Sequence, residues 1–232
     1  MNEDITYTGL GFFGKVTASI SHELKNRMAV INEQAGLLED LVLMAERGAS
    51  TDFERLKRVS NAVKQQVARG DRVLQNMNRF AHSVDHSHCM VEIGSLLDMI
   101  AALAARQAGL KGVPLEVVPA APAVLTTAPF MLMNLIWLCI ESFLSVSKSG
   151  NAIELMCAKQ KEMTTISIGN ASVDGKAKDV DWKPAASVLA SALGAELVWD
   201  YRKGLMTIRL PNTDMRRVSG RGRQDENCRK EE

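Results

Sequence analysis

This chain has few aromatic residues and few long apolar runs, and neither sign of charge is in excess. Among its 232 residues, 28 Lys and Arg balance 27 Asp and Glu, which gives a formal net charge of +1. This balance provides no electrostatic reason to expect nucleic acid or an anionic membrane as a partner. The most apolar stretch, residues 130–146, contains Asn134 and Glu141 and is short for a bilayer, so we expect a buried helix.

Cysteine is also rare. The four cysteines are scattered along the chain without paired spacing, at Cys89, Cys139, Cys157 and Cys228. Those in apolar segments are expected to be small buried side chains. The opening segment, MNEDITYTGLGFF, has no basic region and no long apolar core, so no signal peptide is expected. Together these features predict a reducing, cytoplasmic location.

Two long amphipathic helices are predicted before residue 88. Apolar or small residues recur in steps of three and four at Leu10, Phe13, Val16, Ile20, Leu24, Met28, Ile31, Ala35, Leu38, Val42 and Ala45. After a break at residues 48–50, a second stripe follows at Phe53, Leu56, Val59, Val63, Val67, Gly70, Leu74, Met77, Ala81 and Val84. The short connection predicts an antiparallel hairpin. Because a hairpin does not cover both stripes, we predict that a second copy completes a four-helix bundle.

One histidine stands out on the first helix, within the octet SHELKNRM at residues 21–28. His22 lies two residues from both Ile20 and Leu24. At about 100° per residue, it therefore projects away from the apolar stripe and toward solvent. A neutral imidazole is a competent nucleophile near pH 7, so an exposed histidine here is a candidate carrier of a phosphoryl group.

The neighbours of His22 suit this chemistry. Lys25 and Asn26 stand three and four residues away and flank the imidazole on the same face. Glu23 lies about 100° to one side, where its carboxylate is able to orient a ring nitrogen or to accept its proton. Phosphoryl transfer depends mainly on positioning and charge compensation, which such neighbours supply.

A second group of candidate side chains follows the second helix. Residues four apart share a helix face, so a metal site is one interpretation of His82, His86, His88 and Cys89. The preferred interpretation is a polar end to the helix. The many Arg and Lys residues along the same helix are expected to form a solvated face. We therefore predict no metal.

From residue 89 the pattern alternates between helices and strands, which predicts a two-layer α/β sandwich with a mixed or antiparallel sheet. Expected strands are 90–93, 113–118, 153–158, 164–168, 196–201 and 205–210, and expected helices are 96–108, 130–147 and 184–193. Residues 119–129 are expected to form a loop. Dense charge and few apolar residues predict disorder beyond residue 212. The predicted domains are 1–88 and 89–212, with a tail at 213–232.

The octet SHELKNRM resembles the phosphoacceptor motif of sensor histidine kinases. Similarly, LMNLIWLCIES at 132–142 resembles the asparagine-bearing helix of that family, and GAELVWDYRKGLMTIRLP at 194–211 resembles its final strands. The resemblance implies an α+β fold, in which a hairpin forming a dimeric four-helix bundle precedes a degenerate ATPase-like sandwich. It also implies that His22 is the phosphoacceptor. Glu23 then assists phosphorylation, and Asn26 helps to place a water that dephosphorylates the partner.

Three nucleotide contacts of that family are missing. In that family, the asparagine-bearing helix has a second asparagine four residues after the first, and this residue helps to hold magnesium. Leu138 stands at this position here, and leucine offers no oxygen to a hard cation. The family's Asp-x-Gly-x-Gly loop corresponds to IGNAS at 168–172, which lacks the aspartate and the glycine pair. Its phosphate lid corresponds to residues 173–185, where one glycine is too few for a nest of backbone amides. We therefore expect neither ATP binding nor a cofactor.

These features together predict a histidine phosphotransferase that relays phosphoryl groups between response-regulator receiver domains through His22. Lys25 and Arg27 are expected to supply positive charge to an acidic receiver, and Asn76 and Arg79 of the second helix are expected at a similar height. The expected partners are a second copy and receivers, without nucleic acid or membrane. Two alternatives stay open. One is a working kinase with divergent nucleotide loops, and the other is a non-catalytic protein that sequesters two-component proteins.

Overall fold

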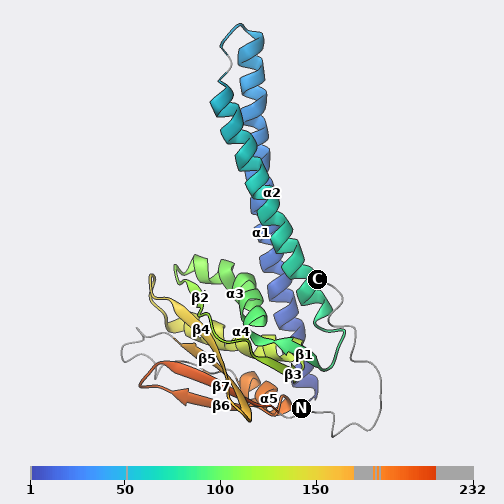
Figure 1. Ribbon diagram of the computed structural model, residues 1–232, viewed down its shortest axis with the longest axis vertical. Helices are drawn as coiled ribbons and strands as arrows, with labels where there is room; N and C mark the ends of the chain where they lie inside the picture. The colour runs from blue at the N-terminus through green and yellow to red at the C-terminus, as the bar shows by residue number, and fades with distance from the viewer. Residues whose placement is uncertain (1, 51, 170–179, 181, 183, 213–232) are drawn as a thin grey trace. The chain divides into compact units, whose positions relative to one another are not determined.

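A computed structural model describes residues 2–50, 52–169, 180, 182 and 184–212 (Figure 1). The chain divides into two compact units, one of residues 17–79 and one in which residues 1–16 join residues 80–232. The expected domain of residues 1–88 keeps the first 16 residues with the hairpin, whereas the compact units place them with the sheet. The expected tail, 213–232, lies outside the described residues.

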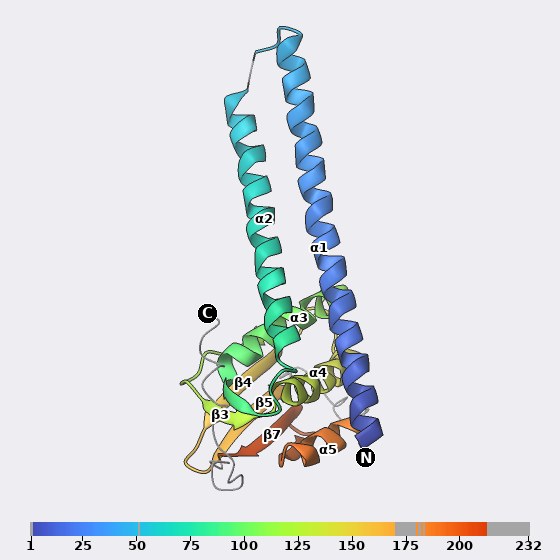
Figure 2. The same ribbon diagram turned by 90° about the vertical axis from the view of Figure 1, so that its right-hand side faces the viewer.

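Helices α1 (Asn2–Glu46) and α2 (Phe53–His82) run antiparallel and side by side (Figures 1 and 2). The predicted break between them is confirmed. α1 ends before Gly48, whose φ of +84° favours glycine. The side chain of Asp52 then caps α2, because its Oδ1 accepts a hydrogen bond from the backbone N–H of Arg55 at 2.9 Å.

The apolar stripes of the hairpin are only partly covered within one chain. Ile20 and Val59 are buried in the structure. By contrast, Met28, Val42 and Val67 keep exposed fractions of 63%, 53% and 48%. A two-helix hairpin has one seam, so the side chains that lie off this seam stay in contact with solvent.

The sheet unit contains two sheets. A five-stranded sheet has the order β2 (Leu115–Val117), β4 (Ile153–Lys159), β5 (Met163–Gly169), β7 (Leu205–Pro211) and β6 (Glu196–Asp200). β2 is parallel to β4, and the other neighbours are antiparallel. A separate two-stranded sheet joins β1 (Cys89–Glu92) to β3 (Val124–Thr127). The five-stranded sheet is therefore mixed, which is one of the two forms that the sequence pattern allowed.

Helices α3 (Ile93–Leu110), α4 (Pro129–Val146) and α5 (Pro184–Ala192) form the second layer. Strand residues alternate between buried and partly exposed, and Ile166, Ile168 and Ile208 belong to the buried set. α3 and α4 are long and apolar enough to cross a membrane by composition, but 67% of the α4 window is buried inside this unit. α4 is the central core helix, as the sequence predicts.

Residues 119–129 are not a loop throughout, which corrects the prediction. Val124 to Thr127 form β3, which pairs with β1 in an antiparallel register that places Thr126 opposite Met90. The strand is short and lies between prolines, so it carries a weak local signal. Its pairing partner is more than 30 residues away in the sequence, and short-range patterns do not report such a contact.

The first turns of α1 bury a different face from the one predicted. The stripe placed Leu10 and Phe13 inside, but these side chains are 66% and 39% exposed. Phe12 is buried instead, with 3% exposure. The ring of Phe12 packs against Phe130 and Trp137 of α4. The predicted apolar stripe therefore does not describe which side chains are buried in the first turns of α1, because α4 packs against a different face of α1 there.

Candidate functional site

His22 lies near the middle of α1, within the unit of residues 17–79, and its side chain is exposed. Lys25 and Asn26 are exposed as well. These three residues share the outer side of the helix, as their spacing of three and four predicts. A protein partner is therefore able to reach the imidazole without any rearrangement of the helix.

The carboxylate beside His22 is already engaged. Glu23 Oε1 accepts a hydrogen bond and ion pair from Arg27 Nη2, one helical turn along α1. Arg27 Nη1 also donates to Gln66 Oε1 of α2 at 3.3 Å. Arg27 was expected, with Lys25, to supply positive charge to a receiver, but its guanidinium is directed toward Gln66 of the second helix. Gln66 carried no sequence signal, since its role depends on the register of the hairpin.

That register also decides which part of α2 lies level with His22. Arg27 lies five residues after His22, and Gln66, its partner on α2, lies five residues before Asp71. Because both helices rise about 1.5 Å per residue, His22 lies close to the level of Asp71. Asn76 is about 7.5 Å further along α2, and Arg79 further still. The expectation that Asn76 and Arg79 lie at a height similar to that of His22 is therefore not met in this register.

The side of α4 that carries Asn134 and Leu138 is buried. Asn134 is 1% exposed and Leu138 is 6% exposed. The carboxamide oxygen of Asn134 has no hydrogen-bond partner within the described residues. Leu138 presents only carbon to its surroundings. Together the two side chains provide no open set of oxygen ligands for Mg²⁺.

Residues from the start of α1 cover the same face of α4. Phe130, Trp137 and Glu141 recur at steps of seven and four, so they share one side of α4, close to Asn134. The centroid of the Phe12 ring lies 5.5 Å from that of Phe130 and 5.4 Å from that of Trp137. Further along, Lys15 Nζ lies 2.6 Å from Glu141 Oε1. This face is thus occupied by the chain's own helix.

The side chains of Asn134, Leu138 and Glu141 on α4 differ in burial, chemistry and pairing. Asn134 is buried, Leu138 has no oxygen and Glu141 is paired with Lys15. Of the loop expected at 168–172, only Ile168 and Gly169 are described, and residues 170–179 lie outside the described part of the chain. Among the described residues, the side chains of α4 are thus the ones that bear on nucleotide binding.

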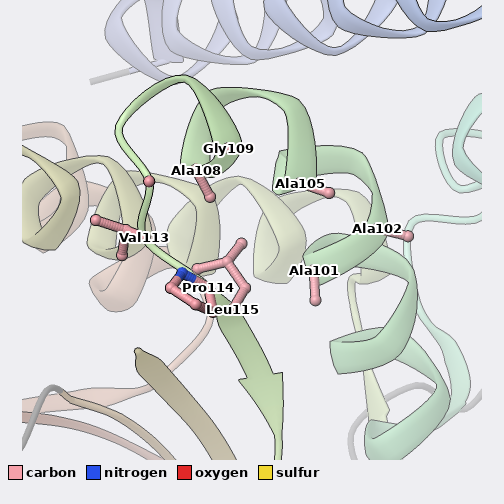
Figure 3. Close-up of a pocket in the computed structure, with 9 residues that line it drawn as sticks. Ala101, Ala102, Ala105, Ala108, Gly109, Val113, Pro114 and Leu115 are labelled. Atoms are coloured by element: carbon pink, nitrogen blue, oxygen red, sulfur yellow. The ribbon is translucent and has the colours of Figure 1, made fainter. Parts of the chain in front are cut away.

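Two further features of the described residues are an ion pair at the end of α2 and a cavity. His82 Nδ1 lies 2.8 Å from Asp85 Oδ2 at the end of α2, an exposed pair. Within the ranges that the structure describes, no three His, Cys, Asp or Glu side chains are placed to hold a metal ion. A cavity of about 580 Å³ lies between α3 and β2, where Ala101, Ala105 and Leu115 form part of an apolar lining (Figure 3).

Cys139 and Glu92 are among the groups of the sheet unit whose pKa values are shifted. Burial raises the pKa of the Cys139 thiol to about 12. Desolvation also raises the pKa of Glu92, but hydrogen bonds outweigh it and leave the pKa below the ordinary 4.5. These bonds come from the backbone N–H of Ser95 at 2.5 Å and of Gly94 at 3.0 Å, so Glu92 is the N-cap of α3. Both groups therefore serve the fold.

Comparisons with known proteins give structural likeness only. No protein-family model matches the chain, and no curated protein matches it in sequence. The histidine kinase AdeS of Acinetobacter baumannii is 10% identical, with a TM-score of 0.45 over 83% of this chain and 98% of that chain. A histidine kinase of Burkholderia phymatum is 12% identical, with a TM-score of 0.45 over 87% and 98%.

One further structure corresponds to a part of the chain. The ATP-binding domain of PrrB from Mycobacterium tuberculosis is 22% identical, with a TM-score of 0.44 over 56% of this chain and 100% of that domain. At these identities the likeness is one of fold alone. The chain consists of an N-terminal helical hairpin followed by an α/β sandwich similar to those of histidine kinases.

Proposed function

We propose that this chain is a histidine phosphotransferase of two-component signalling, which exchanges phosphoryl groups with response-regulator receiver domains through His22. The observation that carries this function is the exposed His22 on α1, within the sequence SHELKNRM. The neighbouring Glu23 and Asn26 supply a carboxylate and a carboxamide at the spacing that the family resemblance implies. Lys25 is exposed beside them and offers positive charge to an acidic receiver.

The transfer step needs only one nucleophile from this chain. A lone pair on an unprotonated ring nitrogen of His22 attacks phosphorus, and the bond from phosphorus to the aspartyl oxygen of the receiver breaks. The aspartate leaves as a carboxylate, and the phosphoryl group stays on the ring nitrogen. Glu23 orients the ring or accepts the proton of the other nitrogen. Most of the rate then comes from positioning and charge compensation.

A separate phosphoryl donor is required because the second half of the chain does not favour ATP. Support comes from Leu138, which replaces a family ligand with carbon, and from the covering of the α4 face by Phe12 and Lys15. A phosphorylated receiver is the donor that fits these residues.

A dimer is part of the same proposal. Exposed apolar residues along the hairpin, such as Met28 and Val67, favour burial against a second copy in a four-helix bundle. Light scattering at micromolar concentration is expected to give twice the mass of the 25.4 kDa chain. A monomer at that concentration contradicts the bundle. We place such a dimer in the cytoplasm, where receiver domains are found.

Transfer is tested with receiver domains from the same genome, each phosphorylated with radiolabelled acetyl phosphate. Acid-labile label is expected to move from at least one receiver to the wild-type chain and not to His22→Ala. Equal labelling of both chains, or of neither, removes the phosphotransferase function. In the second case, a scaffold that binds receivers without accepting phosphate remains.

ATP binding distinguishes the kinase alternative. Isothermal titration with magnesium and ATP is expected to give no measurable heat of binding. Micromolar affinity, followed by labelling of His22 from ATP, identifies a working kinase instead. Leu138→Asn is a useful companion variant, because it restores the oxygen ligand that the family pattern has at this position.

A further inference from the structure

An arginine occupies an unusual place beside His22. Arg27 directs its guanidinium toward Gln66 of α2, and its side chain is only 28% exposed. Its Nε is buried and has no hydrogen-bond partner among the described residues. Burying part of a guanidinium with one N–H unsatisfied costs stability relative to a well-packed apolar side chain. The fold alone gives little reason for an arginine here.

The contacts of Arg27 indicate what this cost achieves. Its Nη2 binds Glu23 Oε1, and its Nη1 binds Gln66 Oε1 at 3.3 Å. Glu23 makes no other hydrogen bond within the described residues, so its second oxygen stays available. Consecutive residues on a helix do not face each other, and Glu23 therefore needs a fixed rotamer to act on His22. The bond to Arg27 supplies such a constraint.

We propose that Arg27 is a positioning residue, which fixes the carboxylate of Glu23, the residue that follows His22 on α1, and is itself braced by Gln66 of α2. This role rests on the proposed function of His22. Arg27 also compensates the negative charge of Glu23 where a phosphoryl group must approach. A change in the packing of α1 against α2 reaches Glu23 through Gln66. Arg27 therefore acts on the chemistry through Glu23 and not by docking a receiver.

Phosphoramidate separates these two roles because it phosphorylates histidine without a receiver. The ring nitrogen of His22 attacks phosphorus, a new phosphorus–nitrogen bond forms, and ammonia leaves as the original one breaks. The rate on the full chain is followed by phosphorus NMR. Arg27→Gln is expected to react about tenfold more slowly than wild type, because Glu23 loses its constraint. A docking role alone predicts no change.

A double-mutant cycle shows whether Arg27 acts through Glu23. In a Glu23→Gln background, Arg27→Gln is expected to change the rate by less than about twofold. A loss of equal size in both backgrounds, or no loss in either, overturns the positioning role. Gln66→Ala is expected to give a smaller loss in the wild-type background. Arg47→Gln, which removes an exposed arginine about 30 Å along the chain from Arg27, serves as the matched control and is expected to react as wild type does.

Two further measurements test the role of Arg27 separately from phosphoryl transfer to receivers and from any loss of folding. The ring-nitrogen NMR signals of His22, identified by their loss in His22→Ala, are expected to shift in Arg27→Gln but not when the same change is made in Glu23→Gln. If no receiver transfers phosphate while this coupling holds, the proposed function falls and the role of Arg27 stands. If the Arg27→Gln variant loses helical ellipticity, its slower rate also reflects unfolding, and the rate of Arg27→Lys is measured instead. This variant keeps the ion pair, so a rate below half that of wild type counts against positioning.

Discussion

Phe12 provides the sharpest test of how the first turns of α1 are held. Its side chain is 3% exposed, and its ring centroid lies 5.3 Å from Phe80, 5.5 Å from Phe130 and 5.4 Å from Trp137. Truncation of a buried phenylalanine to alanine costs about 3–5 kcal/mol. Because Phe12 meets three aromatic partners at favourable separations, we expect Phe12→Ala to lose about 4 kcal/mol of unfolding free energy.

Urea unfolding measures this loss. Trp137, Trp182 and Trp199 all belong to the unit that contains Phe12, so their fluorescence reports on its unfolding. With an m-value of about 2.5 kcal/mol/M, the midpoint of Phe12→Ala is expected about 1.5 M below that of wild type. A loss of this size places residues 1–16 in the packed core of the sheet unit.

Tyr7→Ala is the matched control. Tyr7 is an aromatic residue on the same helix, but its side chain is 80% exposed. Its truncation is expected to change the unfolding free energy by no more than about 0.5 kcal/mol. Equal shifts for Phe12→Ala and Tyr7→Ala would refute the packing of α1 on α4, and so would a midpoint for Phe12→Ala within error of wild type.

Three other predictions concern the sheet unit. Glu92→Gln is expected to cost about 1 kcal/mol at pH 7, since it removes the charged cap of α3. The pKa of Glu92 is lowered in the fold, so its contribution is present above the ordinary carboxyl pKa and is lost as the pH falls through the lowered value. Urea titrations at several acidic pH values should therefore show a flatter pH dependence for the variant. The Cys139 thiol, with a pKa raised to about 12 by burial, should resist iodoacetamide at pH 8 until the chain unfolds, whereas the partly exposed Cys89 is labelled in the native state, as mass spectrometry will show. Gly112→Ala should destabilise the chain by more than about 1 kcal/mol, because φ is +64° and the added Cβ would clash with Ser149 Oγ. Thermal melts of this variant with and without Ser149→Ala should show partial relief of the clash.

The long helices were predictable because their signal is local and repeated. Each stripe of α1 and α2 recurs over many turns, and Gly48 and Asp52 mark the break between them. The exposure of His22 followed from its two-residue offset from the stripe. The strands β4 and β5 were predictable for a similar reason, since short segments that alternate or run apolar between turns favour strands.

Other features needed contacts between distant parts of the chain. β3 has four residues, and its pairing with β1 supplies the order that its own sequence does not. Gln66 meets Arg27 only because the hairpin adopts one register. The same register places Asp71, and not Asn76, level with His22. Such pairings depend on side-chain reach across two elements, and sequence periodicity does not include that information.

The sequence by itself determined most of the elements and the exposed position of His22, because each depends on residue type and local spacing. The tertiary structure alone decided which side of α1 is buried near Phe12 and where Arg27 points. Both outcomes depend on which neighbour packs against a helix. A helical stripe defines the faces of a helix, but only the rest of the fold determines what covers each of them.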